Sequence, residues 1–174
     1  MINLNEAIQH VYDIVGAIYE VHKELGAGLN EYCYQEGFQM QLEEQAIPYV
    51  REMSFHPSYH GKLMQAQYRI DFICKSDVIV ECKAVDDLNS NMRSQLYNYM
   101  RLLKHPCGII VNFGSKTAKV ERYFYDKQTN EILSYDGQVI HRYRKLFLSF
   151  LSFLSSKNSV RYESGVGGLY FGAY

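Results

Sequence analysis

The sequence reads YRIDFICKSDVIVECKAV at residues 68–85. This stretch contains two apolar runs of strand length, separated by a KSD turn at 75–77. Asp71 interrupts the first run, and Glu81 and Lys83 interrupt the second. Because an unpaired charge inside a sheet costs several kcal/mol, these three charges require a physical reason.

The two runs predict a pair of antiparallel strands that brings the three charges together. Side chains alternate between the faces of a strand, so Glu81 and Lys83 share one face while apolar residues occupy the other. The turn at 75–77 folds the chain back, which places Asp71 beside Glu81. We therefore expect two carboxylates and one ammonium group at one end of an otherwise apolar sheet.

Hydrophobic periodicity predicts the other elements around this pair of strands. Three helices are expected, at about residues 4–25, 31–45 and 90–104. Five strands are expected, at about 49–59, 63–74, 77–85, 107–113 and 119–125. The first three strands should form an antiparallel meander. The order of elements predicts an α/β or α+β domain with a mixed β-sheet flanked by helices.

The predicted domain covers residues 1–126, and residues 127–174 are expected to form a C-terminal extension. The segment HRYRKLFLSFLSFLSS predicts a helix at 141–156, followed by a tail rich in Gly, Ser and Tyr. The apolar part of this segment is too short to span a bilayer, which takes about 20 residues. Since MINLNEAIQH also shows no signal peptide, we expect a cytoplasmic protein without a membrane partner.

Composition narrows the classes of function. The formal net charge of −1 is unlike that of a tight, non-specific nucleic-acid binder, which is usually clearly basic. Any nucleic-acid role therefore needs a local basic surface. The four cysteines form no CxxC pair, which favours small buried side chains in a reducing compartment.

The three charges have the chemistry of a site for a hard divalent cation. Mg²⁺ commonly takes one or two carboxylates and keeps several waters, so Asp71 and Glu81 could hold such an ion. A bound metal lowers the pKa of a water ligand, and Lys83 could orient or deprotonate that water or stabilise developing negative charge. The residues alone leave two structural alternatives open, a buried ion-pair cluster and a solvated edge strand.

Three motifs together resemble the GxxExxY family of the PD-(D/E)xK nuclease superfamily. Asp71, nine further residues and then ECK at 81–83 match the D…(D/E)xK signature, with Ile70 where the superfamily's name has proline. Upstream, GLNEYCY at 28–34 has the GxxExxY pattern. Downstream, QLYNY at 95–99 has the QxxxY spacing of RecB-like exonucleases.

This resemblance covers roughly residues 8–125. It implies a restriction-endonuclease-like core that uses Mg²⁺ or Mn²⁺ to hydrolyse phosphodiester bonds. Asp71 and Glu81 would then be the metal ligands, and Lys83 the catalytic lysine. The remaining implied site residues are Glu31, Gln95 and Tyr99, which would line the site and position substrate or water. The resemblance also places His22 behind the ligands or as a ligand itself, whereas its position on the apolar stripe of the first helix favours a histidine packed in the core.

The leading hypothesis from the sequence is a metal-dependent nuclease whose partner is nucleic acid, DNA before RNA. The alternative is a non-catalytic nucleic-acid- or protein-binding module that retains the nuclease fold. The intact set of Asp71, Glu81, Lys83 and Gln95 argues against this alternative, because a retired site should tolerate the loss of such charges. The sequence leaves open whether the chain forms a homo-oligomer.

Overall fold

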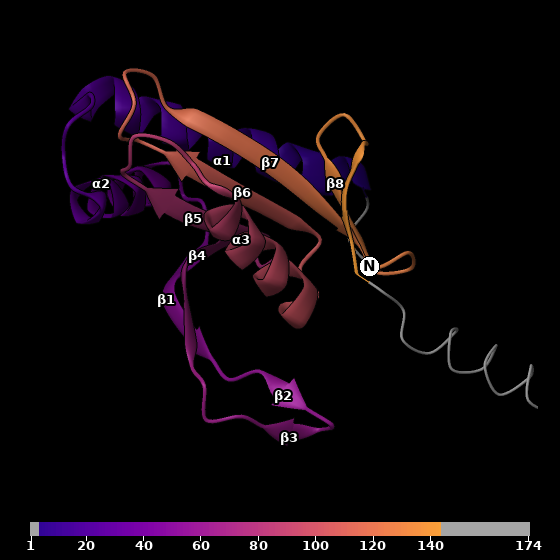
Figure 1. Cartoon of the computed structure of the whole chain (residues 1–174). Coiled ribbons are helices and arrows are strands. Elements are labelled where there is room, and N and C mark those ends of the chain that lie inside the picture. The colour runs from indigo at the N-terminus through magenta and orange to yellow at the C-terminus, as the bar shows by residue number, and fades with distance from the viewer. Residues whose placement is uncertain (1–3, 144–174) are drawn as a thin grey trace, which may run out of the picture. The chain divides into compact units, whose positions relative to one another are not determined.

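Residues 4–143 are described by the computed structural model, and they form a mixed sheet with helices on both faces (Figure 1). The helices of this part of the chain are α1 (Leu4–Leu25), α2 (Glu31–Glu44) and α3 (Ser90–Leu103). Its strands are β1 (Tyr49–Phe55), β2 (Ser58–Tyr59), β3 (Lys62–Leu63), β4 (Tyr68–Cys74), β5 (Val78–Lys83), β6 (Cys107–Asn112), β7 (Lys119–Asp126), β8 (Glu131–Ser134) and β9 (Val139–Arg142). The α/β class and the mixed, helix-flanked sheet are as predicted.

The large sheet has the strand order β1-β4-β5-β6-β7-β8-β9. Strands β5 and β6 are parallel and are connected through α3, whereas every other neighbouring pair is antiparallel. The strands before α3 therefore form the predicted antiparallel meander, β1-β4-β5. Parallel strands with a helical crossover are buried on both faces, which explains why β5 and β6 read as almost continuous apolar runs.

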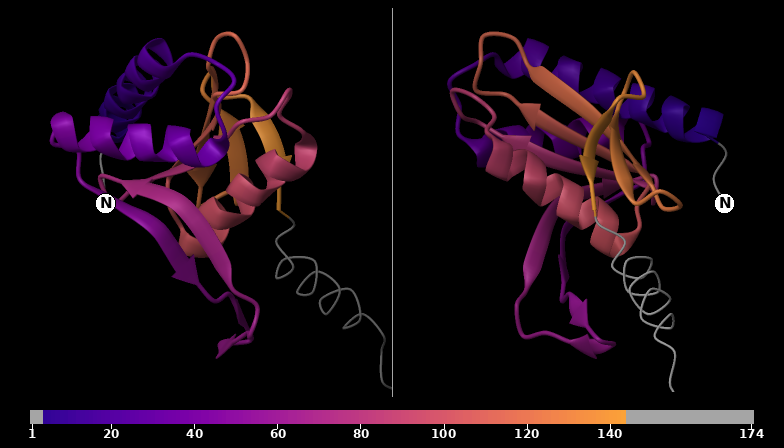
Figure 2. Two further views of the ribbon diagram at one scale, coloured as in Figure 1. Left: turned by 90° about the vertical axis from the view of Figure 1, so that its left-hand side faces the viewer. Right: turned by 45° about the vertical axis from the view of Figure 1, so that its right-hand side comes forward.

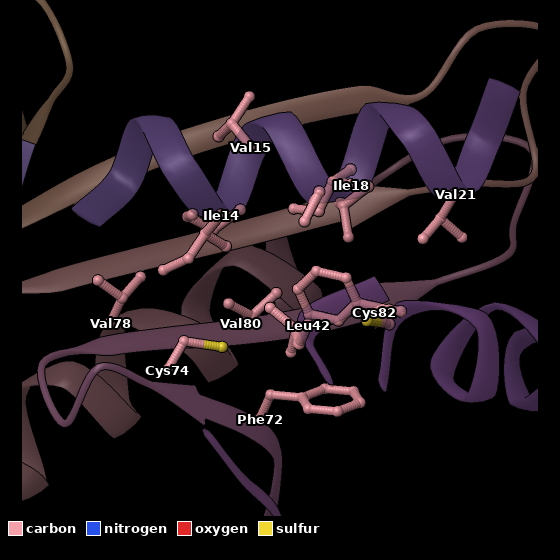
Figure 3. Packing of buried hydrophobic residues seen from close by; sticks show 14 of the residues in the cluster. Ile14, Val15, Ile18, Val21, Leu42, Phe72, Cys74, Val78, Val80 and Cys82 are labelled. Atoms are coloured by element: carbon pink, nitrogen blue, oxygen red, sulfur yellow. The ribbon is translucent and has the colours of Figure 1, made fainter. Parts of the chain in front are cut away.

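Helices α1 and α2 cover one face of the sheet, and α3 covers the other (Figure 2). Figure 3 shows the first of the two resulting cores. There Ile14 and Ile18 of α1 and Leu42 of α2 pack with Phe72 of β4 and Val80 of β5, all at 0 % exposure. The stripe of apolar residues on α1 is thus the contact face that the sequence predicted.

The second core lies between α3 and the opposite face of the sheet. Leu96 and Met100 of α3 are fully buried there with Ile79 of β5 and Ile110 of β6. Gly108 of β6 permits this close approach, because a Cβ at that position would lie 2.4 Å from the sulfur of Met100. The even-numbered positions of β5 therefore face α1 and α2, and its odd-numbered positions face α3.

Strands β1 and β4 extend beyond the sheet as a projecting hairpin, with the small β2–β3 pair near its tip (Figures 1 and 2). We call residues 53–70 the arm. The sequence predicted two uninterrupted strands, at 49–59 and 63–74, around a turn at 60–61. The turn is confirmed, with positive φ at both His60 and Gly61. The strands are interrupted on either side of the β2–β3 pair, where Pro57 cannot donate a ladder hydrogen bond.

The sheet continues past residue 126, because β8 and β9 add two antiparallel strands to β7. The helix predicted at 141–156 is wrong at its start, since His141 and Arg142 belong to β9 and pair with β8. The rest of that helix from residue 144, and the tail after it, lie outside the described residues. Among residues 4–143, no helix is both long and apolar enough to cross a membrane.

Candidate active site

The three charged residues meet at the point where β4 separates from β5. Pairing between these strands ends at Phe72 and Val80, one residue short of Asp71. Beyond this last pair, the Oδ2 of Asp71 accepts a hydrogen bond of 2.8 Å from the backbone N–H of Cys82. The carboxylate thus satisfies a backbone donor of β5 that a continuing β4 would have paired. This bond fixes Asp71 against the residue between Glu81 and Lys83.

Glu81 is a buried carboxyl group, with its side chain 2 % exposed. Its Oε2 lies 3.3 Å from the Nζ of Lys83, whereas its Oε1 is buried and lacks a hydrogen-bond partner among the described residues. Burial, reinforced by the negative charge of Asp71, raises the pKa of Glu81 to about 7. A cation placed against Oε1 would therefore satisfy an unpaired atom and favour the ionised carboxylate.

Lys83 lies between the two carboxylates, with its Nζ 3.3 Å from Glu81 Oε2 and 3.7 Å from Asp71 Oδ2. Its side chain is 13 % exposed, so the ammonium group has largely left bulk water. Burial disfavours the charged form, but the surrounding carboxylates, Glu81 foremost, outweigh it and raise the pKa of Lys83. The ammonium group is accordingly a fixed positive charge in the metal-free site.

The segment GLNEYCY builds the loop that places Glu31 near the end of β5. Gly28 has φ +100°, a conformation that L side chains rarely adopt. The fully buried Tyr34 donates a hydrogen bond of 2.7 Å to the carbonyl of Gly26 and accepts one of 3.2 Å from the N–H of Leu29. The glycine and the tyrosine of this motif thus shape the turn from which α2 begins at Glu31.

From this position Glu31 interacts electrostatically with the charges of the site. Its burial raises the pKa of its carboxyl group, and the negative charge of Asp71 adds to the effect. The positive charge of Lys83 and the backbone N–H of Ala84 act in the opposite direction. Since Lys83 ends β5 and Ala84 follows it, Glu31 lies near this end of the strand.

Gln95 and Tyr99, one turn apart on α3, reach the site from the other layer. The Nε2 of Gln95 donates a hydrogen bond of 2.7 Å to the Tyr99 hydroxyl, which in turn lies 3.4 Å from the carbonyl of Arg69. Burial raises the pKa of the Tyr99 phenol, and the negative charges of Glu81 and Asp71 raise it further. The structure thereby brings both residues of the QxxxY spacing to the edge of the charged cluster.

A family model of the PD-(D/E)XK nuclease superfamily matches residues 8–123, more than half of the 174-residue chain. The chain belongs to the PD-(D/E)XK nuclease superfamily. No curated protein and no solved structure matches it. The observed sheet and helices agree with the fold of this superfamily, and membership supports a nuclease-like function.

PD-(D/E)XK nucleases generally use divalent metals, and the residues of this chain fit such an ion. The Oε1 of Glu81 is a hard oxygen donor that has no hydrogen-bond partner among residues 4–143, and a second carboxylate, that of Asp71, lies close to Glu81. Within residues 4–143, no cluster of three or more His, Cys, Asp or Glu side chains could hold a metal. Two neighbouring carboxylates would fit a divalent ion that takes one or two carboxylate ligands and fills its other positions with water.

His22 is placed differently from the other predicted site residues. Its Nε2 lies 3.0 Å from the carbonyl oxygen of Ser115, and its ring is stacked with Phe113 at 6.3 Å between centroids. These contacts tie the end of α1 to the loop after β6. The structure gives His22 a role in holding this loop, and a role as a metal ligand stays a prediction.

Asn112 is a residue that sequence reasoning missed. It is fully buried at the end of β6, where its Oδ1 accepts hydrogen bonds from Val85 N and Gly114 N, both at 3.0 Å. Its Nδ2 donates a bond of 2.7 Å to Val85 O. The amide therefore clamps the chain two residues after Lys83. The available signal was a single amide ending the apolar run CGIIVNF.

Proposed function

We propose that this chain is a metal-dependent nuclease that hydrolyses phosphodiester bonds in DNA. The observation that carries the proposal is the Oε1 of Glu81, a buried carboxylate oxygen left without a hydrogen-bond partner among the described residues. It lies in a cluster with Asp71 and Lys83, in a member of a nuclease superfamily. A purely structural ion-pair cluster would be expected to satisfy that atom, since an unpaired buried oxygen costs about 1–3 kcal/mol.

In this proposal Asp71 and Glu81 hold Mg²⁺ or Mn²⁺, and Lys83 assists the attacking water. The bound ion would lower the pKa of a coordinated water and offset negative charge on the phosphate. Lys83 is held within 3.3 Å and 3.7 Å of the two ligands, so its ammonium group can orient a water or stabilise charge on a phosphate oxygen beside them. The hydrogen bond from Cys82 N keeps Asp71 in place while this happens.

Three further residues complete the proposed site. Glu31 would line it from the start of α2, and the hydrogen-bonded pair of Gln95 and Tyr99 would position substrate or a metal-bound water. The structural roles of the glycine and tyrosine in GLNEYCY support assignment to the GxxExxY family, and the pairing on α3 supports a QxxxY motif of the RecB-like type. Both assignments are part of the proposal.

A cytoplasmic location belongs to the same proposal. The four cysteines are free, and Cys74, Cys82 and Cys107 are buried. All four lie in the described part of the chain. Free buried thiols are typical of proteins from a reducing compartment.

The test is hydrolysis of linear, circular and single-stranded DNA, with RNA in parallel, in the presence of Mg²⁺ or Mn²⁺. Asp71→Ala and Lys83→Ala should abolish cleavage. The matched controls are Glu20→Ala and Lys23→Ala, which remove an exposed ion pair of 3.1 Å on α1 and should leave cleavage unchanged. Activity that survives both site substitutions would point to a contaminant and refute the mechanism.

Calorimetry with Mn²⁺ separates this proposal from a non-catalytic binding module. The proposal predicts binding at millimolar metal that is lost in Asp71→Ala. A wild-type chain that binds no Mn²⁺ at millimolar concentration would instead favour a module that has kept only the fold.

A further inference from the structure

A cleft of about 440 Å³ lies between the base of the arm and α3. Tyr68, at the start of β4, forms one wall, and the side chains of Asn91, Ser94, Gln95 and Asn98 on α3 line the other. This volume is within the roughly 300–1,000 Å³ of sites that take small molecules and cofactors. Of the residues that line it, Gln95 and Tyr99 also belong to the proposed site.

The lining is rich in neutral hydrogen-bonding groups and carries one cation. Among its side chains, all from the described part of the chain, there is no carboxylate, and Arg101 is the charged member. The Nε of Arg101 is buried and lacks a hydrogen-bond partner among the described residues, while its guanidinium group stacks over the ring of Tyr143 at 4.6 Å. A phosphate group is usually met by several cations, so this lining is better suited to a flat, neutral ligand with several donors and acceptors.

Tyr68 supplies an aromatic surface at the rim of this cleft. Tyr68 remains 44 % exposed although its ring packs against two others, the ring of Phe55 at 5.7 Å and that of Tyr99 at 5.9 Å between centroids. A ring that is both supported and exposed can stack on a base without losing much conformational freedom. The cleft thus offers a stacking surface together with side-chain amides that can hydrogen-bond to the edge of a base.

The cleft adjoins the charged cluster. Tyr99 belongs to the lining of the cleft, and its hydroxyl group lies 3.4 Å from the carbonyl oxygen of Arg69, two residues before Asp71. Gln95, which donates to the Tyr99 hydroxyl, lines the cleft as well. A ligand in the cleft is therefore next to the proposed reaction centre.

The arm that carries Tyr68 has the charge expected of a surface facing nucleic acid. Between Glu52 and Asp71 the sequence contains no carboxylate, whereas Lys62 and Arg69 are exposed cations. Arg69 pairs with Glu52 at 3.3 Å, at the base of the arm, and Lys62 lies in β3 near its tip. Large apolar side chains are also exposed there, with Tyr59 at 68 % and Leu63 at 77 %. A mixture of cations and exposed rings without acidic residues is typical of surfaces that follow a single strand.

From this cleft we infer that the protein binds an unpaired nucleobase beside the scissile phosphate, so that its substrate is single-stranded DNA or an unpaired end. In an intact duplex the face of each base is covered by its neighbours and its pairing edge is occupied, so only an unstacked base can enter. The inference rests on the proposed function, whose substrate it narrows.

The test is fluorescence anisotropy of the full chain with labelled DNA, with Ca²⁺ in place of Mg²⁺ and the integrity of the strand checked on a gel. The probes are a single strand of roughly a dozen nucleotides, within usual site sizes, a blunt duplex of the same sequence, and a set of single strands with one abasic site moved along the sequence. The protein variants are Tyr68→Ala, Tyr68→Phe and Asn98→Ala. The matched control is Tyr19→Ala, which removes a tyrosine of similar exposure, 50 %, from α1 on the opposite face of the sheet.

The wild-type chain should bind the single strand more tightly than the duplex. One abasic position should lower its affinity about tenfold or more, as expected for the loss of one base–aromatic stack. Tyr68→Ala should bind the intact strand about as weakly as the wild type binds the abasic strand, and an abasic site should lower its affinity little further. Tyr68→Phe and Tyr19→Ala should bind like the wild type. Asn98→Ala should also weaken binding of the single strand. If Tyr68→Ala lowers the melting temperature, the affinity of Asn98→Ala tests the inference in its place.

Three results would overturn the inference: equal affinity for duplex and single strand, indifference to an abasic site at every position, or no DNA binding. Binding that depends on a base but is never followed by cleavage would refute the proposed nuclease and would still support the binding of an unpaired base in the cleft. Cleavage with an affinity that no abasic site changes would support the proposed nuclease and refute the inference about the unpaired base.

Discussion

Replacing Glu81 with glutamine tests the metal site through folding stability. The pKa of Glu81 is raised from 4.5 to about 7, chiefly by burial, and its side chain is 2 % exposed. A raised carboxyl pKa means that the native state binds its proton more tightly than the unfolded state does. The resulting contribution of Glu81 to stability is fully present below about pH 4.5 and is lost as the pH rises through 7. At about 1.4 kcal/mol per pKa unit, the ionised carboxylate costs the metal-free fold about 3 kcal/mol at pH 8.

Glutamine removes this cost but also removes the attraction to Lys83, 3.3 Å away. We therefore expect the free energy of unfolding of Glu81→Gln to exceed that of the wild type by about 1–2 kcal/mol in EDTA at pH 8. This difference should disappear toward pH 5. The assay is urea unfolding in EDTA at several pH values, followed by thermal melting with added Mn²⁺. Mn²⁺ should raise the melting temperature of the wild type and leave that of the variant unchanged, because only a state that binds the ion gains stability from it.

Two results would refute this reasoning. A variant that is less stable than the wild type by a few kcal/mol at every pH would show that Glu81 serves a structural ion pair with Lys83. Equal stabilisation of both proteins by Mn²⁺ would show that Glu81 does not hold the ion.

Asn112→Ala should lower the free energy of unfolding by about 2–3 kcal/mol in urea titrations, because it leaves the part-buried backbone groups of Val85 and Gly114 without their partner. Gly114→Ala should lower both the melting temperature and the Mn²⁺ affinity, because its new Cβ would lie 2.7 Å from the backbone N and O of Val85. Glu121→Gln should be less stable than the wild type at pH 7, since the hydrogen bonds from Arg93 hold the pKa of Glu121 below its usual range. That deficit should disappear as the pH falls through the lowered pKa of Glu121.

Each of these predictions has a contradicting outcome. Wild-type stability in Asn112→Ala would mean that water replaces the amide, and an unchanged melting temperature in Gly114→Ala would mean that the loop yields at no cost. A Glu121→Gln deficit that is the same at pH 3 and pH 7 would locate the loss in packing and not in charge.

The strand pair and the meeting of its charges could be predicted from the sequence because both follow from short-range rules. Alternation along 78–83 assigns Glu81 to one face, and the turn at 75–77 returns Asp71 to its side. Helix α1 could be predicted for the same reason, since its apolar stripe has the period of a helix that packs on a sheet.

The remaining features depend on contacts between segments far apart in the chain. The bonds of Asn112 go to Val85, 27 residues earlier, and no pattern around either residue indicates them. Strand β9 is exposed at all four positions, so it shows no alternation that could be recognised. The cleft under the arm requires Tyr68 and Asn98 to lie across from each other, which only the packing of α3 decides.

The hydrogen bond from Cys82 N to Asp71 Oδ2 also bears on the order of events when a metal arrives. Because a backbone donor inside the sheet holds one carboxylate and the strand itself holds the other, folding alone preorganises the two proposed ligands. Binding then requires little rearrangement of the chain, unlike in zinc fingers, where binding free energy is folding free energy. Chelators should strip this protein of its ion and leave a folded apoprotein, ready to be reloaded with a different cation.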